Sequence, residues 1–293
     1  MGIKFYLANL KIHGLEFSKT NKGNIRNLIT LSVQGMQLEL YIDPDVWSGD
    51  IKGFKGKFIE SGYILAKDTT ISEVPELREI VSNICTLLSL GTDSQVRFFK
   101  WESLDLSHSD EWCVNGFYNF YRPPISIKHP ERLKYFIENC YGNFSDLREK
   151  HTLIEAIELF VSSESLSMPV ELKLATIFIL LENLKSSYAK SAGYVFKKGY
   201  FWKESTKGTF DLLLKEMFAS VGISQDLTSI KNLRNEIIHS GLSELPIDEK
   251  MEIFSICKEL SAEYLLRLLG YDGLLNMHTK NGNTTKSLTN NSS

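Results

Sequence analysis

The sequence predicts an α+β protein in which a part built mostly of antiparallel strands is followed by an all-α helical bundle. Up to about residue 128, short apolar and aromatic stretches alternate with polar residues, a pattern typical of half-buried strands. Beyond the double proline Pro123–Pro124, apolar residues recur at steps of three and four, which is typical of amphipathic helices. We therefore expect three segments: an N-terminal α+β domain at 1–128, a helical domain at 129–272 and a disordered tail at 273–293.

Five stretches of the N-terminal part predict strands, because each is rich in aromatic and β-branched residues and is bounded by Gly, Asn or Asp. They are IKFYLANLKIHGLEF (3–17), RNLITLSVQGMQLELYI (26–42), FKGKFIESGYILA (54–66), QVRFFKW (95–101) and WCVNGFYNFY (112–121). One helix is expected among them at 72–91, where apolar residues follow a helical period and Gly91 is expected to end the helix.

The C-terminal part predicts helices, because its apolar residues form stripes of helical period that stop at Gly or begin after capping residues. The expected helical segments are 129–144, 146–165, 169–193, 208–222, 226–241 and 246–270. After Gly270 the apolar content falls, and such a segment buries too little surface to order itself. This composition is the reason for predicting the disordered tail.

Composition excludes several classes of protein. Hydrophobic residues make up 43% of the chain and charged residues 24%, as in an ordinary globular protein. No apolar run reaches the roughly 18–20 residues that a membrane span needs, so we expect a cytoplasmic protein without membrane attachment. The net charge of −3 argues against coating of nucleic acid, so any RNA contact is expected to be local. The four cysteines lack metal-ligand spacing and are expected to be reduced.

The segment LTSIKNLRNEIIHSGLSEL, residues 227–245, contains the residues most suited to chemistry. Asp226 or Thr228 can cap a helix that runs to about Ser240, and Gly241 can take the left-handed conformation that ends it. The buried stripe of this helix is expected to consist of Ile230, Leu233 and Ile237.

Arg234, Asn235 and His239 lie off that stripe and are expected to share one side of the helix. The negative end of the helix dipole favours the protonated imidazole of His239, which suits a proton shuttle. Arg234 offers a bidentate donor for phosphate oxygens. Together they suit cleavage of RNA, whose 2′-hydroxyl attacks its own phosphate once protons are moved and the charge is stabilised. One helix supplies few such groups, so we expect a twofold axis that brings two copies together.

At these residues the chain resembles the HEPN superfamily, whose ribonucleases carry an Arg, a polar residue, three variable residues and a His on one helix of a dimeric α-bundle. The matching residues are Arg234, Asn235 and His239, and the resemblance covers roughly residues 130–270. An added N-terminal domain before the bundle looks most like the ApeA-like HEPN proteins of bacterial antiphage defence. The resemblance implies a homodimeric endoribonuclease that needs neither metal nor cofactor. It also implies that the protein cuts tRNA or another structured RNA in abortive infection, and that a phage-derived trigger or a regulatory partner controls it.

Two weaker sets of candidates accompany the helix. Glu182, in LLENL, could orient the Arg or the His, or it could simply be a solvated glutamate. The stretch YVFKKGYFWKESTKG, residues 194–208, interleaves aromatics with lysines and predicts a surface that stacks bases and follows phosphates. Its candidate RNA-binding residues are Lys197, Lys198, Tyr200, Trp202 and Lys203. Alternatively, the aromatics pack on the bundle while the lysines face water.

Two alternatives to the ribonuclease hypothesis stay open. In the first, Arg234 and His239 are solvated or pair with local acids such as Glu236. In the second, the bundle is a non-catalytic module that dimerises or binds a nucleotide or RNA. Asp43 and Asp45 could suggest a metal, but turn chemistry explains them more simply.

Overall fold

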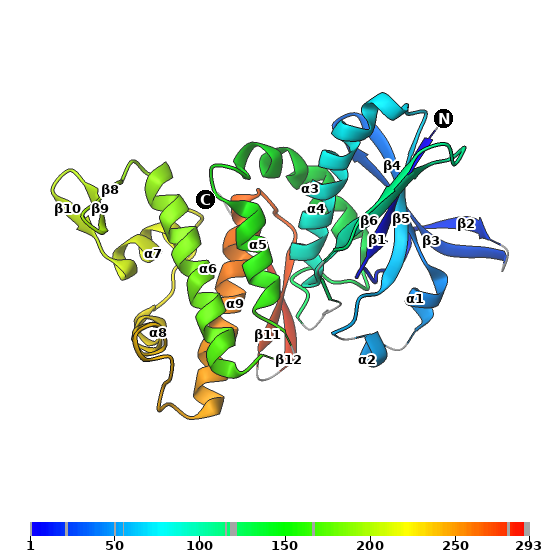
Figure 1. The fold of residues 1–293 in the computed structure, drawn as a ribbon. Helices are drawn as coiled ribbons and strands as arrows, with labels where there is room; N and C mark the ends of the chain where they lie inside the picture. The colour runs from blue at the N-terminus through cyan, green and yellow to red at the C-terminus, as the bar shows by residue number, and fades with distance from the viewer. Residues whose placement is uncertain are drawn as a thin grey trace. The chain divides into compact units, whose positions relative to one another are not determined.

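The chain divides into two compact units. A computed structural model describes residues 2–20, 23–49, 51–54, 56–114, 116–117, 122–165, 168–279 and 282–289. Unit 1 consists of Met1–Ser145 together with Tyr271–Ser293, and unit 2 of Asp146–Gly270. Each unit is described by itself (Figure 1).

Unit 1 is built on a seven-stranded sheet with the strand order β2-β3-β4-β5-β1-β6-β7. Every neighbouring pair is antiparallel, so the predicted α+β class with antiparallel strands is confirmed. The strands are β1 (Gly2–Ala8), β2 (Glu16–Thr20), β3 (Gly23–Val33), β4 (Met36–Ile42), β5 (Glu60–Lys67), β6 (Arg97–Ser103) and β7 (Ser109–Glu111). Three short elements connect them: α1 (Pro44–Ser48), α2 (Ile51–Phe54) and the 3-10 turn η1 (Ile71–Glu73).

The predicted strand at 112–121 is absent from the part of it that the structure describes. Residues 112–114, 116 and 117 are not in a strand, and the others lie outside the described residues. The short strand β7 ends just before this stretch and pairs with β6, from Lys100↔Glu111 to Glu102↔Ser109. The aromatic content of 112–121 predicts a strand, but the residues that pair with β6 are Ser109–Glu111, just before this stretch.

The sheet has a buried face and an outer face, because successive side chains of a strand point to opposite sides. In β1, Ile3, Phe5 and Leu7 are fully buried, whereas Lys4 and Tyr6 lie on the outer face. Helix α3 (Val74–Thr92) covers the buried face and brings a long apolar stripe to it. The core of unit 1 therefore lies between this face of the sheet and its helices.

Gly91 does not end α3, contrary to the sequence-based expectation. The helix continues to Thr92, and Asp93 takes the left-handed conformation with φ 51°. A Cβ atom on Gly91 would lie 2.8 Å from Leu133 Cδ2, in α4 (Pro130–Leu147). Gly91 thus permits close packing of two helices, a role that depends on a neighbour distant in sequence.

Helix α4 belongs to unit 1 as far as Ser145, which corrects the expected domain boundary near residue 128. Lys134 Nζ donates to Thr30 O (2.7 Å), and Glu138 Oε1 accepts from the Ser32 N–H (2.7 Å), so α4 is bonded to β3. The units divide between Ser145 and Asp146 instead. The helical period identified α4 as a helix, but it contains no information about which core the helix joins.

The predicted disordered tail at 273–293 is wrong for its described strands. Strand β11 (Leu274–Thr279) pairs with β12 (Gly282–Ser287) in an antiparallel hairpin that belongs to unit 1. The Asn276 N–H donates to Pro124 O (2.8 Å), and Leu275 and Leu288 are buried. A segment of low apolar content is ordered here because the preceding part of the chain supplies its partners.

Unit 2 is a helical bundle around one central helix, with a small sheet attached. Its elements are α5 (Leu153–Ser162), α6 (Val170–Ser191), β8 (Val195–Lys197), β9 (Tyr200–Lys203), β10 (Thr206–Gly208), α7 (Phe210–Ala219), α8 (Thr228–Ser240) and α9 (Ile247–Leu268). Helix α6 contacts α5, α7, α8 and α9, and Figure 1 shows α5, α6 and α9 side by side. Within the described part of the chain, no helix combines the length and apolarity that crossing a membrane requires.

Asn9 is expected to be a main determinant of the stability of unit 1. It is fully buried at φ 64°, its Oδ1 accepts from the Ile59 N–H (2.9 Å), and its Nδ2 donates to Gln95 O (3.0 Å). Asn9→Ala removes both bonds and places alanine, which tolerates the left-handed region less well than asparagine, at this position, so we expect the free energy of unfolding to fall by about 2–4 kcal/mol. Asn9→Gly removes the same bonds without that strain and should cost about 1 kcal/mol less. Urea unfolding measures both, and equal losses would contradict the strain argument.

Candidate functional site

The candidate helix α8 forms largely as its sequence predicts. Ile230, Leu233 and Ile237 are its buried residues, and Gly241 ends it in the left-handed conformation with φ 75°. At the start of the helix, Asp226 Oδ1 accepts from the Thr228 backbone N–H (3.1 Å) and hydroxyl (2.7 Å). These bonds lower the pKa of the Asp226 carboxyl, the hydroxyl contributing most. Because Ile230, Leu233 and Ile237 are buried, the opposite side of the helix is exposed.

Arg234 is held in one orientation by partners from α6 and α8. Its Nη2 donates to Glu182 Oε1 (2.6 Å), and its Nη1 donates to Asn235 Oδ1 (2.9 Å). The guanidinium carbon lies 5.0 Å from the centre of the Phe210 ring, at the start of α7. These bonds use two of the five N–H donors of the guanidinium, and Nε is buried without a hydrogen-bond partner among the described residues, so an anion would be bound by the remaining N–H groups of Nη1 and Nη2. A fixed arginine of this kind suits a phosphate group.

Glu182 is the residue that orients Arg234. It is partly buried, and its second carboxylate oxygen accepts from Lys185 Nζ, one turn further along α6. The ammonium of Lys185 also lies 5.3 Å from the centre of the Phe210 ring. Glu182 is therefore not a freely solvated glutamate. The spacing of three residues between Glu182 and Lys185 was visible in the sequence, whereas no local pattern connects Phe210 with Arg234.

His239 lies apart from Arg234 within one chain. The two residues are five positions apart, which corresponds to about 140° around a helix. Arg234 faces α6 and is mostly buried, whereas Asn235 and His239 are exposed. Among the described residues, none makes a hydrogen bond or ion pair with the His239 imidazole. The expected sharing of one side thus holds for Asn235 and His239 but not for Arg234.

Arg234 and His239 do not pair with the neighbouring Glu236. The carboxylate of Glu236 instead accepts from the hydroxyl of Ser243 (2.5 Å). Arg234 uses Glu182 from another helix, and the His239 ring is left open to solvent. An exposed imidazole without a structural partner is available to move a proton to or from a bound molecule.

Exposed apolar side chains follow the candidate residues along the chain. Ile238 is 40% exposed, Leu242 68% and Ile247 64%, between the last turn of α8 and the first turn of α9. Ile238 is therefore not a core residue. We call these three residues the α8–α9 apolar patch. Exposed apolar side chains that gather on one surface are typical of regions that contact another protein chain.

The predicted RNA-binding residues lie on the small sheet of unit 2, on different sides of it. The register pairs Lys197 with Tyr200 and Val195 with Trp202, so all four side chains belong to one face. Lys203 belongs to the opposite face, with its Nζ 5.6 Å from the centre of the Tyr194 ring, and Lys198 lies in the turn. In a strand, residues two apart share a face. This period separates Lys203 from Lys197, although the composition of the segment alone places all its lysines on one surface.

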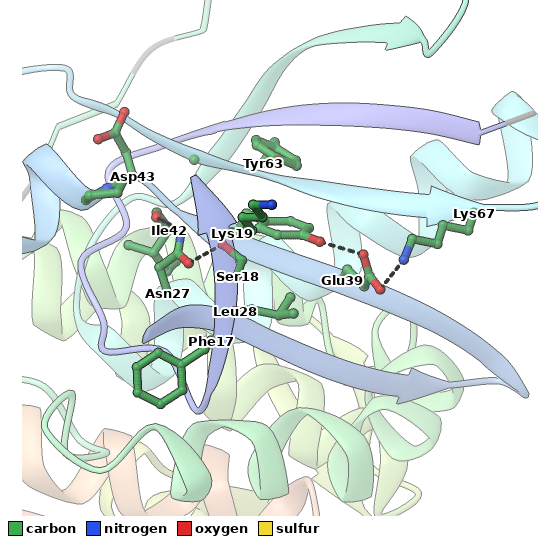
Figure 2. A pocket seen from close by; sticks show the side chains of 13 residues that line it. Phe17, Ser18, Lys19, Asn27, Leu28, Glu39, Ile42, Asp43, Tyr63 and Lys67 are labelled. Carbon is green, nitrogen blue, oxygen red and sulfur yellow. Dashed lines mark hydrogen bonds and ion pairs between the residues drawn. The ribbon is translucent and has the colours of Figure 1, made fainter. Parts of the chain in front are cut away.

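Unit 1 contains a cavity of about 570 Å³ on the outer face of its sheet (Figure 2). Tyr41 and Tyr63 stack within it, with ring centres 4.7 Å apart. Glu39 accepts from the Tyr41 hydroxyl (2.8 Å) and from Lys67 Nζ (2.5 Å). Burial, the bond to Glu39 and its charge raise the pKa of the Tyr41 phenol, which stays protonated and donates. Phe17, 68% exposed on β2, lines the same cavity.

Asp43, which also lines the cavity, has a structural role. Its Oδ1 accepts from the Asp45 backbone N–H (2.7 Å) and caps α1. The capping bond agrees with the turn chemistry expected from the sequence.

No model of a protein family matches the chain, and neither a curated protein nor a solved structure matches it.

Proposed function

We propose that unit 2 is a HEPN-like endoribonuclease that cleaves RNA without a metal ion or cofactor. The observation that supports this most directly is the arrangement on α8. Arg234 is fixed by Glu182 and Asn235 with donors to spare, and His239 lies exposed at the end of the same helix. A positioned cation and an accessible imidazole are the groups that RNA transesterification needs.

In the proposed reaction, the ribose 2′-oxygen attacks the adjacent phosphorus atom, and the bond from phosphorus to the 5′-oxygen breaks. One proton leaves the 2′-hydroxyl and another reaches the departing 5′-oxygen. His239 moves one of these protons, and Arg234 stabilises the added negative charge on the phosphoryl oxygens. Asn235 accepts from Arg234 through Oδ1, which leaves its amide nitrogen as a donor to the same phosphate. The products are a 2′,3′-cyclic phosphate and a 5′-hydroxyl.

The proposed site is composite, formed by two copies of the chain. Arg234 and His239 point to different sides of one α8, so a second copy would supply the complementary group. The α8–α9 apolar patch lies beside His239 in the sequence and gives a homodimer an apolar surface to bury. In this arrangement each cleft contains an Arg234 from one protomer and a His239 from its partner.

Cleavage by the purified protein is expected to persist in excess chelator, because the nucleophile is a hydroxyl of the substrate and the charge is stabilised by Arg234. The assay incubates total tRNA and a structured RNA with the protein in EDTA and identifies the fragment ends. We expect 2′,3′-cyclic phosphates, or 3′-phosphates after their hydrolysis, with 5′-hydroxyl ends. A strict magnesium requirement with 5′-phosphate products would remove this mechanism. A dimer that binds RNA but never cuts it would favour the non-catalytic module.

We further infer that unit 1 senses a phage-derived trigger and that its sheet cavity receives it. The stacked pair Tyr41 and Tyr63, the exposed Phe17 and the ion pair of Glu39 with Lys67 form a surface with both aromatic and charged groups. Such a mixture suits recognition of a specific ligand rather than general adhesion. In this role the trigger raises cleavage above the basal rate of the protein alone, and the faster cleavage stops growth of the infected cell.

Tyr63→Ala is therefore expected to abolish protection against phage while leaving cleavage by the purified protein unchanged. The variant removes one ring of the stacked pair without touching unit 2. Plaque counts and total-RNA integrity after phage challenge measure protection, and RNA cleavage by purified protein serves as the control. Full protection by a folded Tyr63→Ala protein would exclude this cavity as the sensor.

A further inference from the structure

The three-stranded sheet of unit 2 is a rigid platform rather than a loose loop. Strands β8, β9 and β10 are antiparallel neighbours in the order β10-β9-β8. The β8–β9 turn contains Lys198 at φ 52° and Gly199 at φ 79°, the two positive angles that a tight hairpin turn requires. Successive side chains of each strand therefore point to opposite faces of this sheet.

One face of the sheet packs on the helices of unit 2. Phe201 is buried in a cluster with Ala189 from the end of α6, Tyr194 and Leu213 from α7. Lys203 belongs to this inner face, since it lies two residues from Phe201 in the same strand. The inner face is thus a structural contact at Phe201, whereas Phe196 and Lys203, which share this face, are exposed.

The outer face combines the exposed ring of Tyr200 and the half-buried ring of Trp202 with basic side chains. It contains Val195, Lys197, Tyr200, Trp202 and Lys207, as the register of the three strands requires. Tyr200 is 49% exposed, and Lys207 Nζ lies 3.2 Å from the centre of its ring. Lys197 Nζ lies 5.9 Å from the centre of the Trp202 ring. Each aromatic side chain therefore has a lysine beside it.

The charge of this segment differs from that of the whole chain. Residues 194–208 contain four lysines and one glutamate, whereas the chain has a net charge of −3. A local excess of lysine around exposed rings complements a polyanion whose phosphates alternate with flat bases. Double-stranded RNA stacks its bases inside the helix and offers only its backbone and groove edges, so the rings favour a single strand.

The sheet is joined at both ends to elements that hold Arg234. Helix α6 carries Glu182 and ends at Ser191, four residues before β8. Strand β10 ends at Gly208, and Phe210, two residues later, lies against the Arg234 guanidinium at 5.0 Å. The distance along α6 from Glu182 to its end is about 14 Å. The sheet and the candidate site are thus joined by the same helix, α6, and by the start of α7.

We propose, building on the ribonuclease function proposed above, that the outer face of the β8–β10 sheet binds a single-stranded segment of the RNA substrate. Bases stack on Tyr200 and Trp202, and Lys197 and Lys207 bind the flanking phosphates. An exposed contact between an ammonium and a ring is weaker than a base stacked on that ring, so an incoming base displaces Lys207 from Tyr200. The displaced ammonium then lies beside the phosphate of the same nucleotide.

The test measures binding without cleavage, in the full-length His239→Ala protein. The probe is a fluorescein-labelled polyuridylate of about 12 nucleotides, a length that such surfaces cover. Fluorescence anisotropy gives the Kd. Tyr200→Ala is expected to raise it about tenfold, and Tyr200→Phe to leave it unchanged because the ring remains. Thermal melting confirms that each variant is folded.

Lys207 and Lys203 form a matched pair, since they are lysines on opposite faces of one sheet. Lys207→Ala is expected to raise the Kd severalfold and to lower the dependence of log Kd on log salt by about 0.7. Lys203→Ala is expected to change the Kd less than twofold. Equal effects of the two substitutions, with no effect of Tyr200→Ala, would show diffuse attraction by charge and overturn the proposal. Equal affinity for an RNA duplex of the same length, or no binding of the probe, would overturn it as well.

The outcome for this surface is separable from the outcome for the proposed ribonuclease. If the wild-type protein cuts RNA but Tyr200→Ala leaves probe binding unchanged, only the binding surface is refuted. If probe binding depends on Tyr200 but the wild-type protein never cuts RNA, only the ribonuclease function is refuted. The two measurements use different variants and different readouts.

Discussion

His239→Ala is expected to lower the rate of RNA cleavage by about 10²–10⁴-fold, the range that general acid–base catalysis contributes. The free energy of unfolding should stay within about 0.5 kcal/mol of the wild-type value, because an exposed side chain of this kind is away from the core. Single-turnover cleavage and urea unfolding measure the two quantities. Glu236→Gln, on the same helix and also exposed, is the matched control and should retain the wild-type rate.

Substitution of Arg234 is a second, independent test of the same site. Arg234→Lys keeps a positive charge near Glu182 but cannot bond Glu182 and Asn235 through separate nitrogens of one plane. The substitution should therefore lower the cleavage rate strongly while the protein remains folded. If folded proteins with His239→Ala or Arg234→Lys cleaved RNA at the wild-type rate, the assignment of α8 as the catalytic helix would be wrong.

Ile238→Glu is expected to dissociate the homodimer and to remove activity together with it. The residue is 40% exposed in a single chain, so the substitution leaves the core intact. At a dimer contact it would bury an unpaired carboxylate at a cost of about 3–5 kcal/mol, and each 1.4 kcal/mol changes the Kd about tenfold. A modest dimer would become a monomer. Mass measurement in solution and circular dichroism check the oligomeric state and the fold.

The control for Ile238→Glu is Leu106→Glu, which places the same charge on an exposed leucine of unit 1. Leu106→Glu should leave the dimer and the cleavage rate unchanged. Fusion of a dimeric coiled coil to Ile238→Glu should restore part of the activity, since it supplies the second copy by another route. A folded, monomeric Ile238→Glu protein that cut RNA at the wild-type rate would falsify the composite site.

Local patterns in the sequence predicted the elements that depend on local physics. The stretch 3–17 predicts strand, and the structure has strand in its first part, where Ile3, Phe5 and Leu7 are buried, and again from Glu16. The spacing of apolar residues on α8 likewise predicted its buried stripe, and Gly241 predicted its end. These buried faces can be predicted because they depend only on the periods of helix and strand, which are visible within one segment of the sequence.

Predictions failed where an element depends on a distant partner. The helical period predicts α4 but not the unit that it joins. Its hydrogen-bond partners Thr30 and Ser32 lie about a hundred residues earlier in the chain. The low apolar content of 273–293 predicts a tail, whereas the order of the β11–β12 hairpin depends on Pro124. Gly91 predicts a helix end, whereas in the structure it accommodates Leu133.

The candidate residues divide in the same way. The groups that α8 offers are Arg234, Asn235 and His239, and their spacing follows from residue order and helical geometry. Their use within the chain depends on tertiary packing, because Glu182 and Phe210 contact Arg234 from other helices whereas His239 stays exposed. Contacts between segments far apart in sequence depend on packing, and packing is a property of the whole unit rather than of any local pattern.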